Sequence, residues 1–138
     1  MPNEREALPE PVRGLVSRAY EARRRGEAGA ALALYREAAA ASADDPAGRA
    51  HCLRHVGDLE REAGRPAEAR AALAEAEALY RRTAGDILSL ANTVRLVALV
   101  DGSPERWREA RALYEQAGEE SGLDLGPAFA ECDRHLSA

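Results

Sequence analysis

Residues 68–76 read EARAALAEA and residues 109–117 read EARALYEQA. Both stretches place an alanine, then a large residue four positions later, then a second alanine three positions after that. The same spacing occurs at Ala31, Tyr35 and Ala38, so the chain carries three copies. Residues three and four positions apart share one face of an α-helix. The copies therefore predict three helices that bury similar stripes of small and large side chains.

The composition favours an all-helical protein with a single domain. Among the 138 residues are 31 alanines and 19 arginines and no lysine, and alanine and arginine are strong helix formers. One Phe, one Trp and four Tyr are the only aromatic residues, so the core must consist mainly of small aliphatic side chains. We expect one domain over residues 9–138 after a flexible tail at residues 1–8, which carry no apolar stripe.

Proline and glycine divide the chain into seven segments with helical periodicity and no strand. Asp45, Asp86 and Ser103 stand where N-caps are expected. The last segment has a single apolar stripe of Phe129 and Cys132 with Leu136, and is expected to cap the preceding helix pair. The predicted helices are 11–25, 27–42, 46–63, 66–82, 86–100, 104–119 and 127–136.

These residues resemble the tetratricopeptide repeat (TPR) family, whose helix pairs carry a small residue in the first helix and an Ala-x3-aromatic-x2-Ala pattern in the second. Ala19, Gly57 and Ala98 each stand twelve residues before a signature alanine. The resemblance covers residues 12–136. It implies a right-handed α-solenoid of three antiparallel pairs, at about 11–42, 46–82 and 86–119, with a capping helix at 127–136.

The repeats depart from the usual TPR pattern. Signature alanines are 38 and 41 residues apart, against 34 in the family. Arg18 replaces an expected apolar residue, and Glu60 and Asp101 replace expected aromatics. Residues 90–96, followed by 107–117 and by Glu131 and Cys132, are similar to a group of bacterial TPR proteins without an assigned activity. We therefore expect a degenerate, long-repeat TPR protein of this bacterial kind.

Close helix approach explains the small residues. Gly57, Ala69 and Ala110 are expected to bring the backbones of each pair into contact, while Leu53, Tyr35 and Tyr114 fill the space between pairs. A large side chain in place of a small one is expected to disrupt the packing.

The family binds its ligands on the concave surface of the first helices, so the positions facing that groove are the candidate site. Six are arginine and only Asp58 and Glu62 are acidic, although the whole chain has a net charge of -5. Val16, Tyr20 and Leu99 would add apolar contacts. The predicted ligand-binding residues are Arg13, Tyr20, Arg23, Arg24, His51, Arg54, Arg61, Asn92 and Arg95.

This site suggests a non-enzymatic module that binds an acidic segment of a protein or peptide, with arginine forks on carboxylates and Asn92 on the peptide backbone. An alternative is that the arginines pair with Asp58, Glu62 and neighbouring acids and form an ordinary charged surface. A second functional hypothesis makes the chain a homo-oligomer, most simply a homodimer, whose main partner is another copy that covers an apolar end of the stack.

Cysteine and histidine gather in two short clusters, which raises a third hypothesis of a metal-dependent protein. His51, Cys52 and His55 form one cluster, and Cys132 and His135 the other. Their spacings suit zinc ligands, but the third and seventh helices are too far apart in a repeat stack to share an ion. We expect free cysteines in the core, partly exposed histidines, no cofactor and no enzymatic activity, since no catalytic motif is present.

The charge and the hydropathy exclude other classes. The acidic net charge disfavours a nucleic-acid partner. The most apolar run, residues 87–100, contains Asn92, Thr93 and Arg95 and is too polar to span a bilayer. Because residues 3–6 do not resemble a secretory signal, we expect a cytoplasmic protein.

Overall fold

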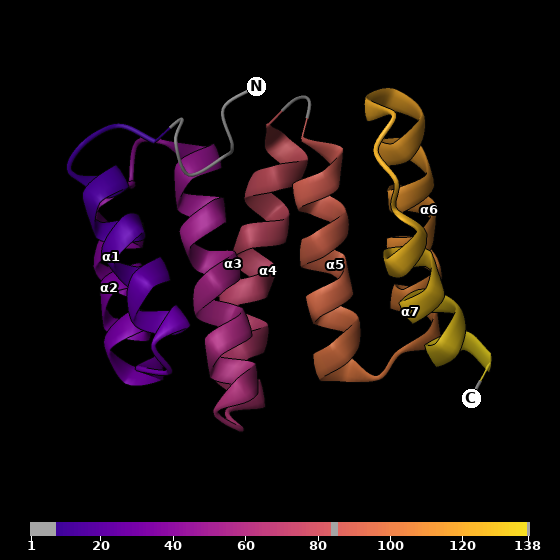
Figure 1. Ribbon diagram of the computed structural model, residues 1–138, viewed down its shortest axis with the longest axis horizontal. Helices are drawn as coiled ribbons and strands as arrows, with labels where there is room; N and C mark the ends of the chain where they lie inside the picture. Colours follow the sequence, from indigo (N-terminus) through magenta and orange to yellow (C-terminus); the bar gives the residue numbers. More distant parts are fainter. Residues whose placement is uncertain (1–7, 84–85, 138) are drawn as a thin grey trace. The chain divides into compact units, whose positions relative to one another are not determined.

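The computed structural model describes residues 8–83 and 86–137, and these residues form seven α-helices and no strand (Figure 1). Each helix begins and ends within two residues of the range expected from the sequence, which confirms the all-helical fold. The helices are α1 (Val12–Arg24), α2 (Ala28–Ala41), α3 (Pro46–Glu62), α4 (Pro66–Arg82), α5 (Ile87–Asp101), α6 (Pro104–Ser121) and α7 (Gly126–Ser137).

Three helices begin at the N-caps expected from the sequence. The side chains of Asp45, Asp86 and Ser103 each accept a hydrogen bond from the backbone amide three residues later, at 3.2, 3.0 and 3.4 Å. Proline follows Asp45 and Ser103 directly, where its missing N–H leaves no helical hydrogen bond unmade. The N-cap prediction is confirmed at all three positions.

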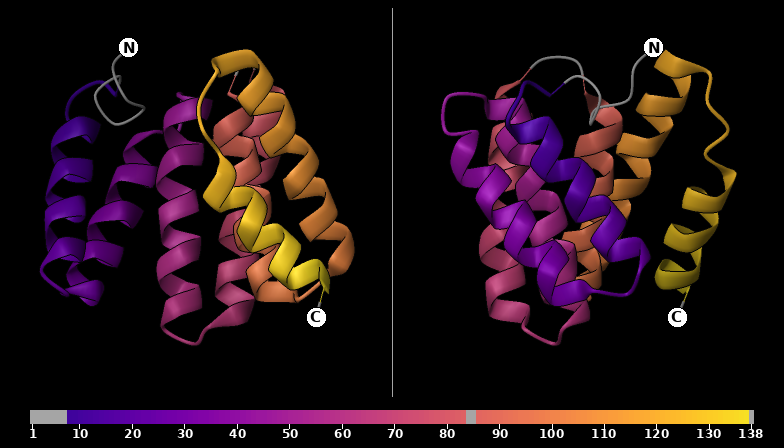
Figure 2. Two further views of the ribbon diagram at one scale, coloured as in Figure 1. Left: turned by 45° about the vertical axis from the view of Figure 1, so that its right-hand side comes forward. Right: turned by 60° about the vertical axis from the view of Figure 1, so that its left-hand side comes forward.

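The chain divides into two compact units, Met1–Thr83 (unit 1) and Ala84–Ala138 (unit 2). In unit 1, α1 packs on α2, α2 on α3 and α3 on α4, and short turns reverse the chain between them (Figure 1). In unit 2, α5 packs on α6, and α7 packs back on α6 (Figure 2). The expected packing of the last helix on the preceding pair is therefore confirmed within unit 2.

The repeated residues form the packing surfaces of both units. All nine alanine, tyrosine and leucine positions of the three copies are buried, with exposed fractions of 4% or less. Alanines at these positions let helices approach closely, and the larger residues fill the remaining volume. The buried positions are Ala31, Tyr35, Ala38, Ala69, Leu73, Ala76, Ala110, Tyr114 and Ala117.

Gly57 of α3 lies where α4 approaches closely. A Cβ atom at this position would lie 2.5 Å from Cγ of Leu73 and 3.4 Å from the backbone oxygen of Ala69. Carbon atoms in contact normally stand about 3.5 to 4.0 Å apart. The expected backbone contact at Gly57 is confirmed, and glycine is needed there because α4 occupies the space of a side chain.

Glu60, at an expected aromatic position, is buried and held by arginines. Arg65 donates two hydrogen bonds to its carboxylate, from Nε at 2.9 Å and from Nη2 at 2.7 Å. Arg36 of α2 adds an ion pair at 3.3 Å. The hydrogen bonds and charge of Arg65, with the charge of Arg36, lower the pKa of Glu60 although desolvation raises it. An ion triad thus ties α2 and the α3–α4 turn to α3.

One residue of the expected flexible tail is packed in the core, so the prediction of a loose tail is wrong at Leu8. Leu8, the last residue of the predicted tail, is buried, and its Cδ2 atom lies 3.1 Å from where a Cβ atom of Gly48 would stand. The rest of the predicted tail, residues 1–7, lies outside the described residues. No helix among the described residues is long and apolar enough to cross a membrane.

Candidate functional site

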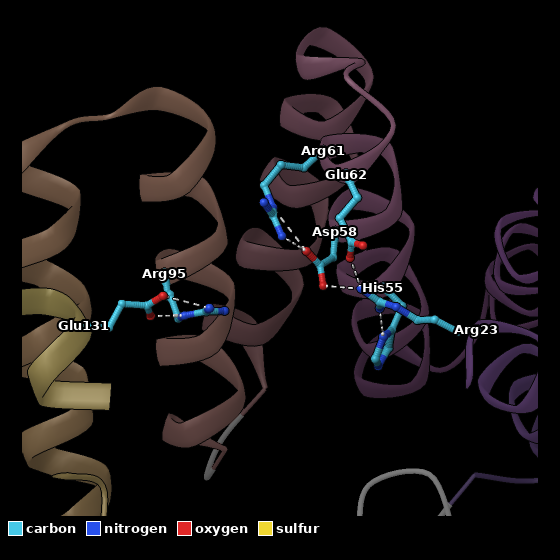
Figure 3. Close-up of polar contacts among 7 residues, drawn as sticks. All are labelled: Arg23, His55, Asp58, Arg61, Glu62, Arg95 and Glu131. Carbon is cyan, nitrogen blue, oxygen red and sulfur yellow. Dashed lines mark hydrogen bonds and ion pairs between the residues drawn. The ribbon is translucent and has the colours of Figure 1, made fainter. Parts of the chain in front are cut away.

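The site residues predicted in unit 1 centre on an ion-pair network between α1 and α3, which we call the Arg23 network (Arg23, His55, Asp58, Arg61 and Glu62). Arg23 extends from α1 and donates to Asp58 on α3 at 2.7 Å and to Glu62 one turn later (Figure 3). Arg61 donates to the other oxygen of Asp58 at 2.7 Å. The Asp58 carboxylate thus lies between the guanidinium groups of Arg23 and Arg61, and Glu62 is a second partner of Arg23.

The electrostatics keep the carboxylate and the guanidinium at the centre of the network ionised. Burial lowers the pKa of Arg23, but hydrogen bonds and charges from Asp58 and Glu62 outweigh it and raise that pKa. Burial raises the pKa of Asp58, and the hydrogen bonds of Arg23 and Arg61 reverse this and lower it. The ion pairs between α1 and α3 therefore persist at neutral pH.

His55 completes the network as a neutral ring. Burial, with the charges of Arg54, His51 and Arg23, lowers its pKa well below the usual value. Its Nδ1 lies 3.4 Å from Nη1 of Arg23, which can only donate. The ring stacks on Tyr35, with centroids 4.6 Å apart and planes inclined by 6°. His55 therefore connects the polar network to the buried repeat position Tyr35.

Two more arginines of the predicted site, both on α1, have carboxylates beside them. Arg13 pairs with Glu10 at 3.1 Å, and Arg24 pairs with Glu21 at 3.4 Å. With these two acids included, the five predicted site arginines of unit 1 face four carboxylates. The local positive excess in unit 1 is therefore one charge, smaller than the sequence positions alone suggest.

Exposure separates the predicted positions that a partner can touch from those it cannot. Tyr20 is 42% exposed, and with Leu123 it is one of two exposed large hydrophobic residues in the described part of the chain. His51 is only 6% exposed and Val16 is fully buried. The expectation of a partly exposed histidine is therefore wrong at His51, which packs edge-on against His55. Val16 likewise belongs to the core, because it shares the α1 stripe with Ala19.

The two predicted site residues of unit 2 take part in contacts within that unit. The hydroxyl of Tyr114 donates to Oδ1 of Asn92 at 2.6 Å. Arg95 on α5 forms a two-pronged ion pair with Glu131 on α7, with Nη2 and Oε2 3.0 Å apart (Figure 3). These contacts occupy Oδ1 of Asn92 and the Nε and Nη2 groups of Arg95.

Neither cysteine–histidine cluster assembles into a site. Cys52 and Cys132 are free thiols with no exposed surface, as expected from the sequence. Their burial keeps both sulfur atoms from a substrate in this conformation. Among the described residues, no group of three or more His, Cys, Asp or Glu side chains is placed to hold a metal ion. His135 instead stacks on Trp107, with centroids 4.0 Å apart.

The alternative in which the site arginines pair with Asp58, Glu62 and neighbouring acids is confirmed in unit 1 at Arg13, Arg23, Arg24 and Arg61, whereas the Arg95–Glu131 pair was not predicted from the sequence. Glu21 and Arg24 are i,i+3 neighbours in α1, and Glu10 lies three residues before Arg13 in the turn that precedes α1, so this spacing was the available signal. Arg23–Asp58 and Arg95–Glu131 are 35 and 36 residues apart and leave no local signal. Comparison with family models, curated proteins and solved structures finds no match to this chain.

Proposed function

We propose that this chain is a non-enzymatic, TPR-like interaction module that binds a segment of another protein through exposed side chains of α1 beside the Arg23 network. The observation that carries the proposal is the setting of Tyr20. This ring is 42% exposed on a helix whose neighbouring turns carry Arg13, Arg23 and Arg24. Tyrosine and arginine are the residues most enriched at the energetic centres of protein interfaces.

The Arg23 network supports the proposal because it rigidifies the binding elements. Arg23 spans from α1 to two carboxylates of α3, so the spacing of these helices is set before a partner arrives. Binding to a rigid surface costs less conformational entropy than binding to a mobile one. We assign Tyr20 as the apolar anchor, with Arg13 and Arg24 as charge contacts for an acidic segment.

The burial of all three repeat copies supports the wider assignment to a right-handed solenoid of TPR-like pairs. Within unit 1, Arg54 and Arg61 of α3 would extend the binding surface of α1. Arg61 would contribute less than Arg13 and Arg24, because its side chain is 31% exposed against 51% and 65% and it shares Asp58 with Arg23.

A display library of random peptides, screened against the immobilised chain at low salt, tests the function. The proposal predicts enriched peptides that combine acidic and apolar residues, and weaker binding at high salt. The variant Tyr20→Ser/Arg24→Glu should lose binding. Arg108→Glu is the matched control, because Arg108 and Arg24 are both 65% exposed and each faces a glutamate three residues earlier.

Two outcomes would contradict the proposal. If Arg108→Glu weakens binding as much as the α1 variant, the interaction is a general charge effect. If no peptide is enriched and the chain sediments as a concentration-dependent oligomer, self-association replaces partner binding as the function.

A further inference from the structure

Helix α7 is attached to unit 2 by few apolar contacts. Of its twelve residues, only Cys132 is buried. By contrast, α6 buries Trp107, Ala110, Tyr114 and Ala117. Burial of apolar surface is the main source of helix–helix stability. The α7 helix must therefore depend on other contacts to stay in place.

Those contacts are ion pairs and ring contacts with α5 and α6. Glu131 pairs with Arg95 of α5, and Asp133 accepts from Nε of Arg111 at 2.8 Å. The guanidinium of Arg111 also lies 5.1 Å from the ring centre of Phe129. Hydrogen bonds from Arg95 and Arg111 lower the pKa values of Glu131 and Asp133, so both acids are charged at neutral pH.

Both helices can keep their ends when they separate. The left-handed Gly122 (φ +70°) ends α6 through a 2.8 Å hydrogen bond from its amide to the Gly118 carbonyl. The side chain of Asp124 accepts from the Gly126 amide at 2.9 Å and starts α7. Arg111 also retains Glu115, a partner on its own helix, at 2.6 Å. Release of α7 therefore keeps the C-terminal end of α6, the first turn of α7 and the Arg111–Glu115 ion pair, and it breaks the Arg95–Glu131 ion pair.

We propose that α7 is an electrostatically held cap, which opens away from α6 as ionic strength rises and uncovers Cys132 and Trp107 while α5 and α6 stay folded. Surface ion pairs weaken when salt screens them, whereas apolar contacts do not weaken in this way. This cap is independent of the binding surface assigned to α1, which lies in unit 1.

The two cysteines provide an internal comparison for the test. Cys132 is the one buried residue of α7, and Cys52 is equally buried in α3 of unit 1. The intact chain is treated with iodoacetamide, and the labelling rate of each cysteine is measured by mass spectrometry. Each rate in the folded chain is divided by the rate of the same cysteine in the urea-unfolded chain, which corrects for its intrinsic reactivity. Between ~0.05 M and ~1 M NaCl, labelling of Cys132 should rise about threefold to tenfold, while Cys52 stays protected.

Two variants separate cap opening from changes in thiol acidity. Glu131 raises the pKa of Cys132 and Arg95 lowers it, although burial is the larger influence. Glu131→Gln and Arg95→Gln both break the same ion pair but shift this pKa in opposite directions. Both should speed the labelling of Cys132 at low salt and flatten its salt response. The exposed Glu119→Gln is the charge-matched control and should change neither.

Trp107 adds an independent readout because it is the only tryptophan. Its emission should shift to longer wavelength with salt, while the helical circular dichroism falls only by the share of α7. If Cys132 stays as protected as Cys52 at high salt, or both become labelled together, the proposal is wrong. The proposal is also wrong if Arg95→Gln slows the labelling of Cys132. Faster labelling in Glu131→Gln would then come from a lower pKa of the thiol and not from opening of the cap.

Discussion

Replacing Gly57 by alanine tests the close approach of α3 and α4 at a single methyl group. The added Cβ would lie 2.5 and 2.6 Å from Cγ and Cδ2 of Leu73, more than 1 Å inside normal contact. Leu73 has no exposed surface, so it has little room to move. Overpacking of this kind costs about 1 to 3 kcal/mol. Alanine recovers about 1 kcal/mol of helix propensity, so the net loss of stability is up to about 2 kcal/mol.

A double-mutant cycle with Leu73→Ala isolates the contact. Leu73→Ala alone should cost about 2 to 5 kcal/mol, since it removes a fully buried side chain. It also removes both atoms that collide with the new methyl group. In that background Gly57→Ala should stabilise the protein by about 1 kcal/mol, through helix propensity alone. The predicted coupling energy is therefore about 1 to 3 kcal/mol, and the double mutant should be more stable by this amount than the sum of the two single effects predicts.

Urea unfolding followed by far-UV circular dichroism measures all four corners of the cycle. Gly29→Ala is the matched control in unit 1, because Gly29 lies in α2 with no atom within 4 Å of its added Cβ. It should be neutral or stabilise by up to about 1 kcal/mol. The reasoning is refuted if Gly57→Ala stabilises as much as Gly29→Ala, or if its effect is the same with and without Leu73.

Three further predictions concern single residues in unit 1, each measured by urea unfolding. Glu60→Gln should lower the free energy of unfolding at neutral pH by about 1 to 3 kcal/mol, because it removes the charge that Arg65 and Arg36 hold. The pKa of Glu60 is lowered in the folded protein, so its contribution to the free energy of unfolding is complete above about pH 4.3 and is lost as pH falls through the folded pKa. The stabilities of wild type and variant should therefore converge in acid. A constant difference down to low pH would contradict this. Asp45→Ala should cost about 1 kcal/mol through loss of the α3 N-cap, and Asp45→Asn much less; equal losses would argue against capping. Gly64→Ala should cost about 1 kcal/mol from its φ of +78° alone, with Gly64→Asn less costly; a stabilising alanine would exclude left-handed strain.

The helices and their burial could be predicted because they depend on local spacing. The Ala-x3-large-x2-Ala copies define one helix face each, and all nine of their residues are buried. The N-caps at Asp45, Asp86 and Ser103 follow from the side chain and its own next turn. Gly57 was also predictable, since its distance from the repeat alanine marked it as a contact point.

The candidate site was less predictable because its contacts join distant parts of the chain. The sequence offered ion pairing of the groove arginines with Asp58 and Glu62 as an alternative to a free basic surface, but it could not decide between the two. His51 was expected to be a partly exposed ligand-binding residue, but it is buried. Glu60 was noted only as a missing aromatic, whereas its carboxylate is the centre of a buried ion triad.

The amino-acid sequence by itself determined the seven helices, their ends and the faces they bury, because helix periodicity and capping act over three or four residues. The tertiary structure alone decided which charges are neutralised, which rings stack and how firmly α7 is held. Many of those outcomes depend on distances between residues that are 20 to 39 positions apart in the chain, such as Tyr35 and His55 or Arg23 and Glu62. A Coulomb or stacking interaction is set by separation in space, and the sequence specifies that separation only through the packing of whole helices.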